Sequence, residues 1–304
     1  NFIAETQGSM RVIDTAIVVI SADEGVQVIT EKVWKWAEEK ALPCAIFVNK
    51  LGHERANLTK VLDDIEKTFK KKAVKFQVPI GSGANFKGVV DLIKMKSYSF
   101  SNDQSGKTTE GEIPSDLKDE TDQYREELIE AAAETNDELT EKYLEEGSLT
   151  EDEIKRGLKA GINNATVIPI LYGSALNNHG VSSLLDIIVE YLPSPDVRPP
   201  MKGKDDSEKE VVRQNSPDEP LSALVFKTIA DPYAGQLTLF RTYSGVLKAD
   251  SVVLNSSKES KEKLGSLFCI QGKNQTSVPS ISAGDFGVVA KLKNTVTGDT
   301  FTDD

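Results

Sequence analysis

The feature that most constrains this chain is the alternation of short, unbroken apolar runs with helical patterns in its first half. Residues 15–21 and 44–49 are two such runs, and their lack of polar interruption is typical of strands covered on both faces. Between them Ile29, Val33 and Trp36 recur at helical spacing, and Pro43 is expected to end the helix. This alternation predicts an α/β domain with a mostly parallel sheet.

The pattern continues through a helix around residues 61–69 and a strand over residues 73–80, and is then interrupted. Residues from about 82 to 165 read as a strand pair, a polar turn and a long acidic helical stretch, which predicts an inserted subdomain. Within it Thr150 and Glu153 form a capping box, and Gly161 is expected to end the helix that begins there. The strand and helix alternation resumes over residues 166–191.

A second domain with a different pattern comes after a connector. Residues 194–219 contain a proline cluster and a charged run, and predict an extended, solvated linker. From residue 220 to 304 short alternating strands are separated by Gly, Asp and Ser, which favours a small β-barrel. The expected fold class is therefore α/β plus all-β, with residues 1–193 as the first domain.

Composition limits the classes of function. The 304 residues carry a net charge of −12, so bulk charge disfavours nonspecific binding to nucleic acid, and any RNA contact must come from a local patch. The start of the chain has neither the basic residues nor the apolar run of a signal peptide, and no apolar stretch is long enough to span a membrane. Cys44 and Cys269 lie in apolar runs and are expected to be buried thiols in the cytoplasm. No metal site is expected at them.

Two loops carry the chemistry that the sequence suggests. Asn49 and Lys50 follow one apolar strand, and Ser174, Ala175 and Leu176 follow another. In a GTP-binding domain the first loop presents Asn-Lys-x-Asp to the base, where the Asn joins the base loops and the Lys stem covers the purine. A backbone N–H at Ala175 suits the guanine carbonyl. The alternative for Asn49 and Lys50 is a solvated turn, but two loops at the ends of strands favour a base site.

Many further stretches resemble bacterial elongation factor G or a close paralogue, from after the second switch region to the end of the second domain. The similarity is carried by short motifs spread over both domains, among them residues 9–14, 47–50, 79–81, 86–92, 173–176, 191–195, 230–233, 241–245, 283–285 and 297–300. The resemblance implies a GTPase domain with an inserted subdomain, followed by a translation-factor β-barrel. It also implies GTP or GDP with Mg²⁺ in the full-length protein, and a ribosome as partner.

Within that resemblance, the barrel is expected to dock on small-subunit rRNA and the insertion to face the large-subunit stalk protein. For Arg241 and the segment from Asp231 through Tyr233 to Gly235, an RNA contact and a solvated strand or turn are both open. His53 and His179 do not align with the catalytic histidine of the family and are expected to be exposed. No catalytic residue is assigned.

Two departures from the family matter for activity. Gly52 occupies the position of the Asp in Asn-Lys-x-Asp, so two charge-assisted hydrogen bonds to guanine are lost and affinity is expected to fall by about two to four orders of magnitude. The phosphate loop and both switches are expected to lie before Asn1. Residues 105–109 resemble the end of such a loop, but residues 110–114 after them cannot open a helix, so a hairpin tip is expected there.

The leading hypothesis is therefore a fragment of a translocation GTPase that has no turnover by itself. A second is a non-hydrolysing ribosome-binding paralogue, motivated by Gly52. A third is another translational GTPase, acting in ribosome protection, recycling or peptide release. Because the strand over residues 15–21 would lack its usual neighbour, we also expect it either to pair with a second copy or to be covered by the N-terminal segment.

Overall fold

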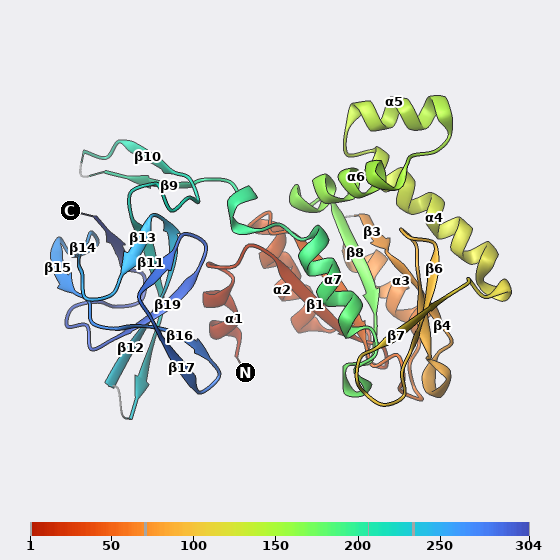
Figure 1. Ribbon diagram of the computed structural model, residues 1–304, viewed down its shortest axis with the longest axis horizontal. Coiled ribbons are helices and arrows are strands. Elements are labelled where there is room, and N and C mark those ends of the chain that lie inside the picture. The colour runs from red at the N-terminus through yellow and green to blue at the C-terminus, as the bar shows by residue number, and fades with distance from the viewer. Residues whose placement is uncertain (1, 70–71, 206, 233–234, 304) are drawn as a thin grey trace. The chain divides into compact units, whose positions relative to one another are not determined.

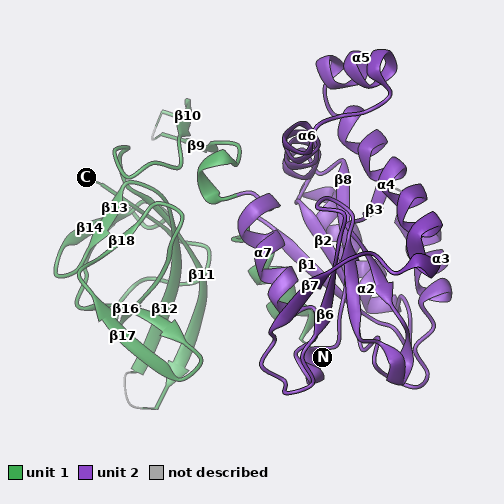
Figure 2. Ribbon diagram, turned by 45° about the vertical axis from the view of Figure 1, so that its right-hand side comes forward, with its two compact units in different colours: residues 1–13, 194–304 green, residues 14–193 purple. Residues whose placement is uncertain are grey.

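The computed structural model describes residues 2–69, 72–205, 207–232 and 235–303, which form two compact units. Figure 2 colours them separately: residues 14–193 make one unit, and residues 1–13 together with 194–304 make the other. We call them the α/β unit and the barrel unit. The barrel unit is thus built from both ends of the chain, and residues 1–13 belong with the barrel and not with the α/β unit.

The α/β unit contains two sheets, as the strands and helices in Figure 1 show. Its elements in chain order are β1 (Ala16–Ser21), α2 (Val28–Glu39), β2 (Cys44–Asn49), α3 (Leu58–Thr68), β3 (Lys72–Lys75), β4 (Gln77–Ile80), β5 (Gly88–Asp91), β6 (Lys96–Phe100), β7 (Thr108–Gly111), α4 (Lys118–Ala133), α5 (Asp137–Glu146), α6 (Glu151–Asn163), β8 (Val167–Tyr172) and α7 (Val181–Tyr191).

The parallel sheet of this unit has the strand order β1-β2-β8-β3, with every neighbouring pair parallel. Strands β2 and β8 are in the middle and are buried along nearly their whole length, as unbroken apolar runs predict. Strand β1 is at one edge of this sheet, and Ile17 and Val19 on it are exposed. The predicted α/β class with a parallel sheet is confirmed.

The strand predicted over residues 73–80 is two strands in two different sheets. β3 completes the parallel sheet, whereas β4 begins an antiparallel sheet of order β4-β5-β6-β7. The change falls at Phe76, which is buried and bonds through its backbone to Ile170 on one side and Leu92 on the other. The inserted segment therefore starts with a continuous extended chain that passes from one sheet to the next.

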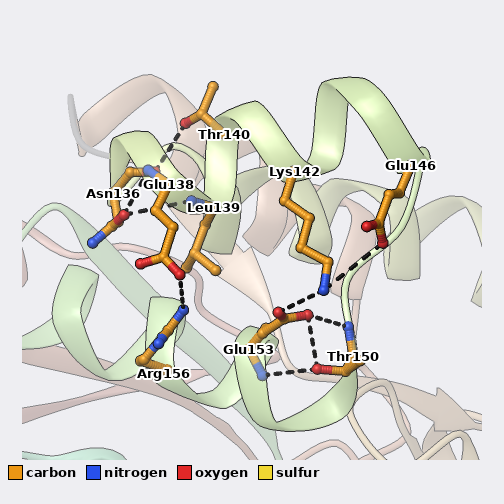
Figure 3. Close-up of polar contacts among 9 residues, drawn as sticks. All are labelled: Asn136, Glu138, Leu139, Thr140, Lys142, Glu146, Thr150, Glu153 and Arg156. Carbon is orange, nitrogen blue, oxygen red and sulfur yellow. Dashed lines mark hydrogen bonds and ion pairs between the residues drawn. The ribbon is translucent and has the colours of Figure 1, made fainter.

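The helical part of the insertion is held by caps and by ion pairs between α5 and α6 (Figure 3). The side chain of Asn136 accepts hydrogen bonds at the start of α5, and Thr150 and Glu153 form the predicted capping box of α6. Lys142 on α5 contacts Glu153 at 2.7 Å. The insertion core includes Leu128, Leu139, Ile154 and Leu158, all buried.

Gly161 does not end α6, contrary to the prediction. The helix continues to Asn163, and Gly161 is buried inside it. A Cβ at this position would lie 2.5 Å from Cγ2 of Val167 and 2.8 Å from Cγ2 of Thr135. The glycine is therefore required by the close approach of α6 to β8 and to the end of α4, and not by a left-handed turn.

In its described residues the barrel unit has an eight-stranded antiparallel sheet around one apolar core, with two additional strand pairs. Its elements are α1 (Ile3–Ser9), β9 (Met201–Lys204), β10 (Glu210–Arg213), β11 (Ser222–Asp231), β12 (Gly235–Ser244), β13 (Val246–Lys248), β14 (Val252–Asn255), β15 (Ser260–Lys263), β16 (Leu267–Gln271), β17 (Asn274–Val278), β18 (Ser280–Ser282), β19 (Phe286–Ala290) and β20 (Thr300–Thr302). The all-β class of this part is confirmed, and the linker expected to be extended and solvated contains the β9–β10 hairpin.

The two cysteines differ in environment. Cys44 is buried at the start of β2, as predicted, but Cys269 is exposed. The reason lies in the pairing of β16: β19 pairs only with Leu267 and Phe268, so beyond them β16 is paired with β17 alone. Cys269 lies on that extension, where no core covers it.

Candidate functional site

Three strand ends meet at one edge of the parallel sheet. Ser21 at the end of β1 is in register with Asn49 at the end of β2, and β8 ends at Tyr172 next to β2. Backbone hydrogen bonds join the loops after these strands: Ala22 donates to Asn49, Gly173 donates to Val48, and Leu51 donates to Gly173. Because the carboxyl ends of parallel strands form the usual ligand edge of an α/β sheet, this is the candidate site.

Asn49 connects the two predicted base loops. Its Oδ1 accepts hydrogen bonds from the backbone N–H of Ala175 at 2.9 Å and of Lys50 at 2.8 Å. The prediction that the Asn side chain joins the two loops therefore agrees with the geometry. The N–H of Ala175, however, is donated to Asn49, and a guanine carbonyl would have to share or replace that bond.

The remaining residues of the second loop differ in exposure. Ser174 is buried and makes a two-way backbone pair with His179, whereas Leu176 is 89% exposed in the short 3₁₀ helix η3 (Ala175–Asn177). The exposed Leu176 and Ala175 lie on the open side of the loop. The structure thus brings Asn49, Ser174 and Ala175 together.

Lys50 is held by an aspartate that the sequence analysis did not select. Its backbone is left-handed, and its Nζ lies 3.4 Å from Oδ1 of Asp23, in the loop after β1. His53 and Arg55 also face the Asp23 carboxylate, at 3.8 and 3.9 Å. A hydrogen bond from the Ser21 hydroxyl, followed by the charge of Lys50, lowers the pKa of Asp23. Its position just after an apolar strand is the sequence signal that could have identified it.

Gly52 faces the second loop at the position where the family carries the base-reading Asp. A Cβ built on Gly52 would lie 3.3 Å from Nδ2 of Asn177 and 3.5 Å from Oγ of Ser174. The Asn177 carboxamide therefore lies next to the space that an Asp side chain would enter. A carboxamide offers two N–H donors and one acceptor oxygen, while a carboxylate offers two acceptor oxygens, so the Asn177 side chain does not supply the pair of carboxylate oxygens that an Asp would direct at guanine.

His179 is not an exposed loop residue, contrary to the prediction, because it packs under the β6–β7 hairpin. Its side chain is 9% exposed, and its ring stacks on Phe100 with centroids 4.8 Å apart. His53 is partly exposed, as expected. The stretch from Ser105 to Thr109 lies in the tip and second strand of this hairpin, as the sequence predicts.

A cavity of about 620 Å³ opens beside Gly52. Asn177 and His179 line it from the second loop, Asn102 and Gln104 from the hairpin, and residues 83–87 from the turn after β4. Neither Asn49 nor Ala175 is among the described residues that line it. The cavity therefore lies on the insertion side of Gly52 and is distinct from the junction made by Asn49.

Arg241 is neither an exposed strand residue nor available for RNA, so both expectations are wrong. It is 1% exposed, its Nη1 donates to the carbonyl of Val12 at 2.8 Å, and its guanidinium stacks on Tyr243 and Phe286. The Tyr243 hydroxyl donates to the carbonyl of Arg11 at 3.1 Å. These residues attach the N-terminal segment to the barrel. Tyr233, in the other segment considered for RNA, lies outside the described residues.

The described part of the chain shows neither a metal cluster nor a membrane span. There, no group of three or more His, Cys, Asp or Glu side chains is placed to hold a metal ion. None of the described helices is both long and apolar enough to cross a bilayer.

The parallel sheet with its helices and the large antiparallel sheet are consistent with a GTPase-type domain followed by a β-barrel domain. Residues 1–101 match the family model of the elongation factor Tu GTP binding domain, and residues 220–304 match that of elongation factor G domain 2. The first of these families is GTPase-type and implies binding of a guanine nucleotide.

A crystal structure of a protein from Thermus thermophilus is similar over the whole chain, with 28% identity and a TM-score of 0.82. The present chain covers 42% of the length of that protein. Together with the two family models, this similarity shows that the chain is elongation factor G-like.

Proposed function

We propose that this chain supplies the base-binding half of the nucleotide site of a ribosomal translocation GTPase, together with its ribosome-docking barrel. The observation that carries the proposal is the pair of hydrogen bonds accepted by Asn49, which ties the loop after β2 to the loop after β8. In this role the stem of Lys50 covers the purine face, and Ser174, Ala175 and Leu176 form the rim of the base pocket. Lys50, whose side chain is 47% exposed, would have to turn away from Asp23 to do so.

In the full-length protein GTP or GDP would bind with Mg²⁺, which would neutralise phosphate charge. The described residues that support a nucleotide site are those of the two base loops. We therefore propose that the chain by itself binds nucleotide weakly and has no turnover, and we derive no step through Mg²⁺.

The second candidate is a ribosome-binding paralogue that does not hydrolyse GTP, and Gly52 together with Asn177 favours it. The side chain next to the Cβ position of Gly52 is the amide of Asn177, at 3.3 Å, and not a carboxylate. The proposed pocket therefore lacks the two carboxylate oxygens that would select guanine over adenine. Roles in ribosome protection, recycling or release remain proposals of the same class.

For partners, the elongation factor domains imply an interaction with the ribosome in the family. We propose that the barrel contacts small-subunit rRNA, that the insertion faces the stalk protein, and that the protein acts in the cytoplasm. Arg241 is not part of such an RNA contact, because it is buried.

The exposed edge of β1 remains a proposed contact with a second copy. The N-terminal segment does not form a strand beside β1, and the described residues of the sheet end at this strand. Light scattering tests the proposal: a dimer that dissociates after Val19→Lys is expected, because a charge on an edge strand opposes pairing. A monomeric wild-type chain would contradict it.

Calorimetric titration of GDP and ADP tests the proposed base site. We expect weak binding without a preference by the wild-type chain, and a gain of about 10²–10⁴-fold for GDP over ADP in Gly52→Asp, since two charge-assisted hydrogen bonds are restored. The backbone at Gly52 is not in the left-handed region, and a Cβ at this position requires only the Asn177 amide to move, by a few tenths of an ångström.

A matched control is Gly203→Asp, because Gly203 lies in β9 with no atom within 4 Å of a built Cβ. It adds the same charge away from the site and should change neither affinity. Tight, guanine-selective binding by the wild-type chain would contradict the stated role of Gly52, and no gain in Gly52→Asp would contradict the base site.

A further inference from the structure

The tip of the β6–β7 hairpin, residues 101–107, has a shape fixed by its own hydrogen bonds. The backbone of Ser101 donates to Lys107 at 3.0 Å, and the Asp103 carboxylate accepts from the Ser101 hydroxyl at 2.6 Å and the Ser105 backbone at 3.0 Å. Hydrogen bonds from Ser101 and Ser105 lower the pKa of Asp103 to about 2, so the carboxylate is charged at neutral pH. The tip is thus held together by hydrogen bonds of its own, and the backbone carbonyls of Gln104 and Gly106 accept hydrogen bonds from outside it.

Both carbonyls bind side chains that come after the second base loop. Nδ2 of Asn178 donates to the carbonyl of Gln104 at 3.0 Å, and the hydroxyl of Ser182 donates to the carbonyl of Gly106 at 2.7 Å. Asn178 has a left-handed backbone directly after η3, and Ser182 lies in the first turn of α7. Two side-chain donors between Ala175 and the first turn of α7 therefore bind backbone carbonyls of the insertion.

Gly106 is required for this approach. Its φ is +73°, and a Cβ there would lie 2.8 Å from Nδ2 of Asn178 and 3.3 Å from the Ser182 hydroxyl oxygen. Any side chain at this position would be strained and would separate the two partners. The sequence from Ser105 to Thr109, which resembles a phosphate loop, thus has a different explanation.

The stack of His179 on Phe100 is the third contact between the hairpin and the loop. Phe100 ends β6, and the His179 ring is nearly parallel to it at 16°. The backbone of His179 pairs in both directions with Ser174, at 2.9 and 3.0 Å. The ring contact therefore stabilises the loop from Ser174 to His179, in which the N–H of Ala175 donates to Asn49.

We propose that the hairpin is a latch that holds the second base loop in the geometry in which Ala175 meets Asn49, with Asn178 and Ser182 as positioning residues. Its link to nucleotide rests on the proposed function. Because a coupling between two sites is reciprocal, a partner that draws the insertion hairpin away loosens the base loop, and a base bound at the loop strengthens the docking of the hairpin.

Hydrogen exchange of the full chain without nucleotide tests the latch, using Asn178→Gly and Ser182→Ala. Glycine keeps the left-handed backbone at position 178 and removes the amide. The amides of Ser174, Ala175 and His179 should exchange about two- to tenfold faster in each variant, the effect of one neutral hydrogen bond. Ser183→Ala is the matched control, because Ser183 is next to Ser182 in α7 and donates to no hairpin carbonyl among the described contacts.

A second readout separates the latch from the nucleotide proposal. In the Gly52→Asp background, a positioning role predicts that GDP affinity falls by a similar factor in both latch variants and not in Ser183→Ala. Unchanged exchange at the three amides overturns the latch, and faster exchange with unchanged GDP affinity overturns its link to nucleotide binding. Failure of GDP to bind in any background refutes the proposed function instead, while the exchange comparison still decides whether the hairpin holds the loop.

Discussion

At the scale of single residues, the tightest constraint is the contact of Gly161 with β8. Only a hydrogen atom fits where α6 passes Val167 and Thr135, since a Cβ would approach both methyl groups to less than 3 Å. From the sequence, Gly161 was expected to end the helix. The packing shows a different reason for the glycine, because only a residue without a side chain fits at this position.

We expect Gly161→Ala to lower the free energy of unfolding of the α/β unit by about 1–2 kcal/mol. Overpacking a core costs roughly 1–3 kcal/mol, and the gain in helix propensity is at most about 1 kcal/mol. Differential scanning calorimetry measures the change. The matched control is Gly8→Ala in α1, where a Cβ would meet no atom within 4 Å, and which should be neutral or stabilising. A Gly161→Ala protein as stable as wild type would contradict the packing argument.

The residues of the candidate site show which parts of it the sequence could predict. Asn49 and Ala175 were predictable, because apolar strands of fixed pattern put the loops after them at one sheet edge. The burial of His179 was not, because it depends on a stacking partner, Phe100, far away in the sequence. The same holds for Arg241, whose partner Val12 is 229 residues distant.

At the scale of elements, one carboxylate both caps α6 and joins it to α5. Glu153 accepts from Lys142 and from both the backbone and the hydroxyl of Thr150 (Figure 3). The hydrogen bond from Lys142, followed by those from Thr150, lowers the pKa of Glu153 to about 2. Glu153 therefore serves as the cap of α6 and as the ion-pair partner of α5.

This shift predicts a pH dependence of the insertion. Because the pKa of Glu153 in the folded state is below the ordinary value of 4.5, its stabilising contribution is complete above about pH 4.5 and is lost as the pH falls towards 2. Glu153→Gln keeps the capping box, which accepts Gln, and removes the charge. Urea unfolding from pH 2 to 6 should show a smaller loss of stability in this variant on acidification. Parallel pH profiles for the two proteins would exclude the role of the Glu153 charge.

The elements themselves were largely predictable from periodicity, and the exceptions have physical causes. The strand patterns gave the class of both units, since alternation and unbroken runs reflect burial on one or two faces. The division at Phe76 was not visible, because no Gly, Asn, Asp or Ser turn signal separates β3 from β4 and the chain stays extended between the two sheets that they join. The β9–β10 hairpin was missed, because its strands are short, charged and exposed.

At the scale of the whole molecule, the barrel unit includes an N-terminal segment that is held by two backbone carbonyls. Val12 is buried, its carbonyl accepts from Arg241, and the neighbouring carbonyl of Arg11 accepts from Tyr243. An ion pair between Glu5 and Lys227 is exposed by comparison. We therefore expect the hydrogen bonds from Arg241 and Tyr243, and not the exposed ion pair, to hold the N-terminal segment on the barrel.

We expect Arg241→Met to release this segment, because the carbonyl of Val12 loses its donor while much of the packing volume is kept. Trypsin cleavage after the exposed Arg11 reports the release, and its rate should rise by about tenfold or more, the effect of an unpaired buried acceptor. Glu5→Gln removes only the exposed ion pair and should change the rate by less than about twofold. Equal cleavage of wild type and Arg241→Met would show that Arg241 does not hold the segment.

The construction of the barrel unit from both chain ends has a consequence for biosynthesis. Arg241, the hydrogen-bond donor to the carbonyl of Val12, is synthesised 229 residues after Val12. At translation rates of about 5–20 residues per second, that delay is roughly ten to fifty seconds. During this time Met10 and Val12, both buried in the folded protein, are apolar side chains without their barrel partners, so this segment of the nascent chain is open to chaperone binding until the strand that carries Arg241 emerges.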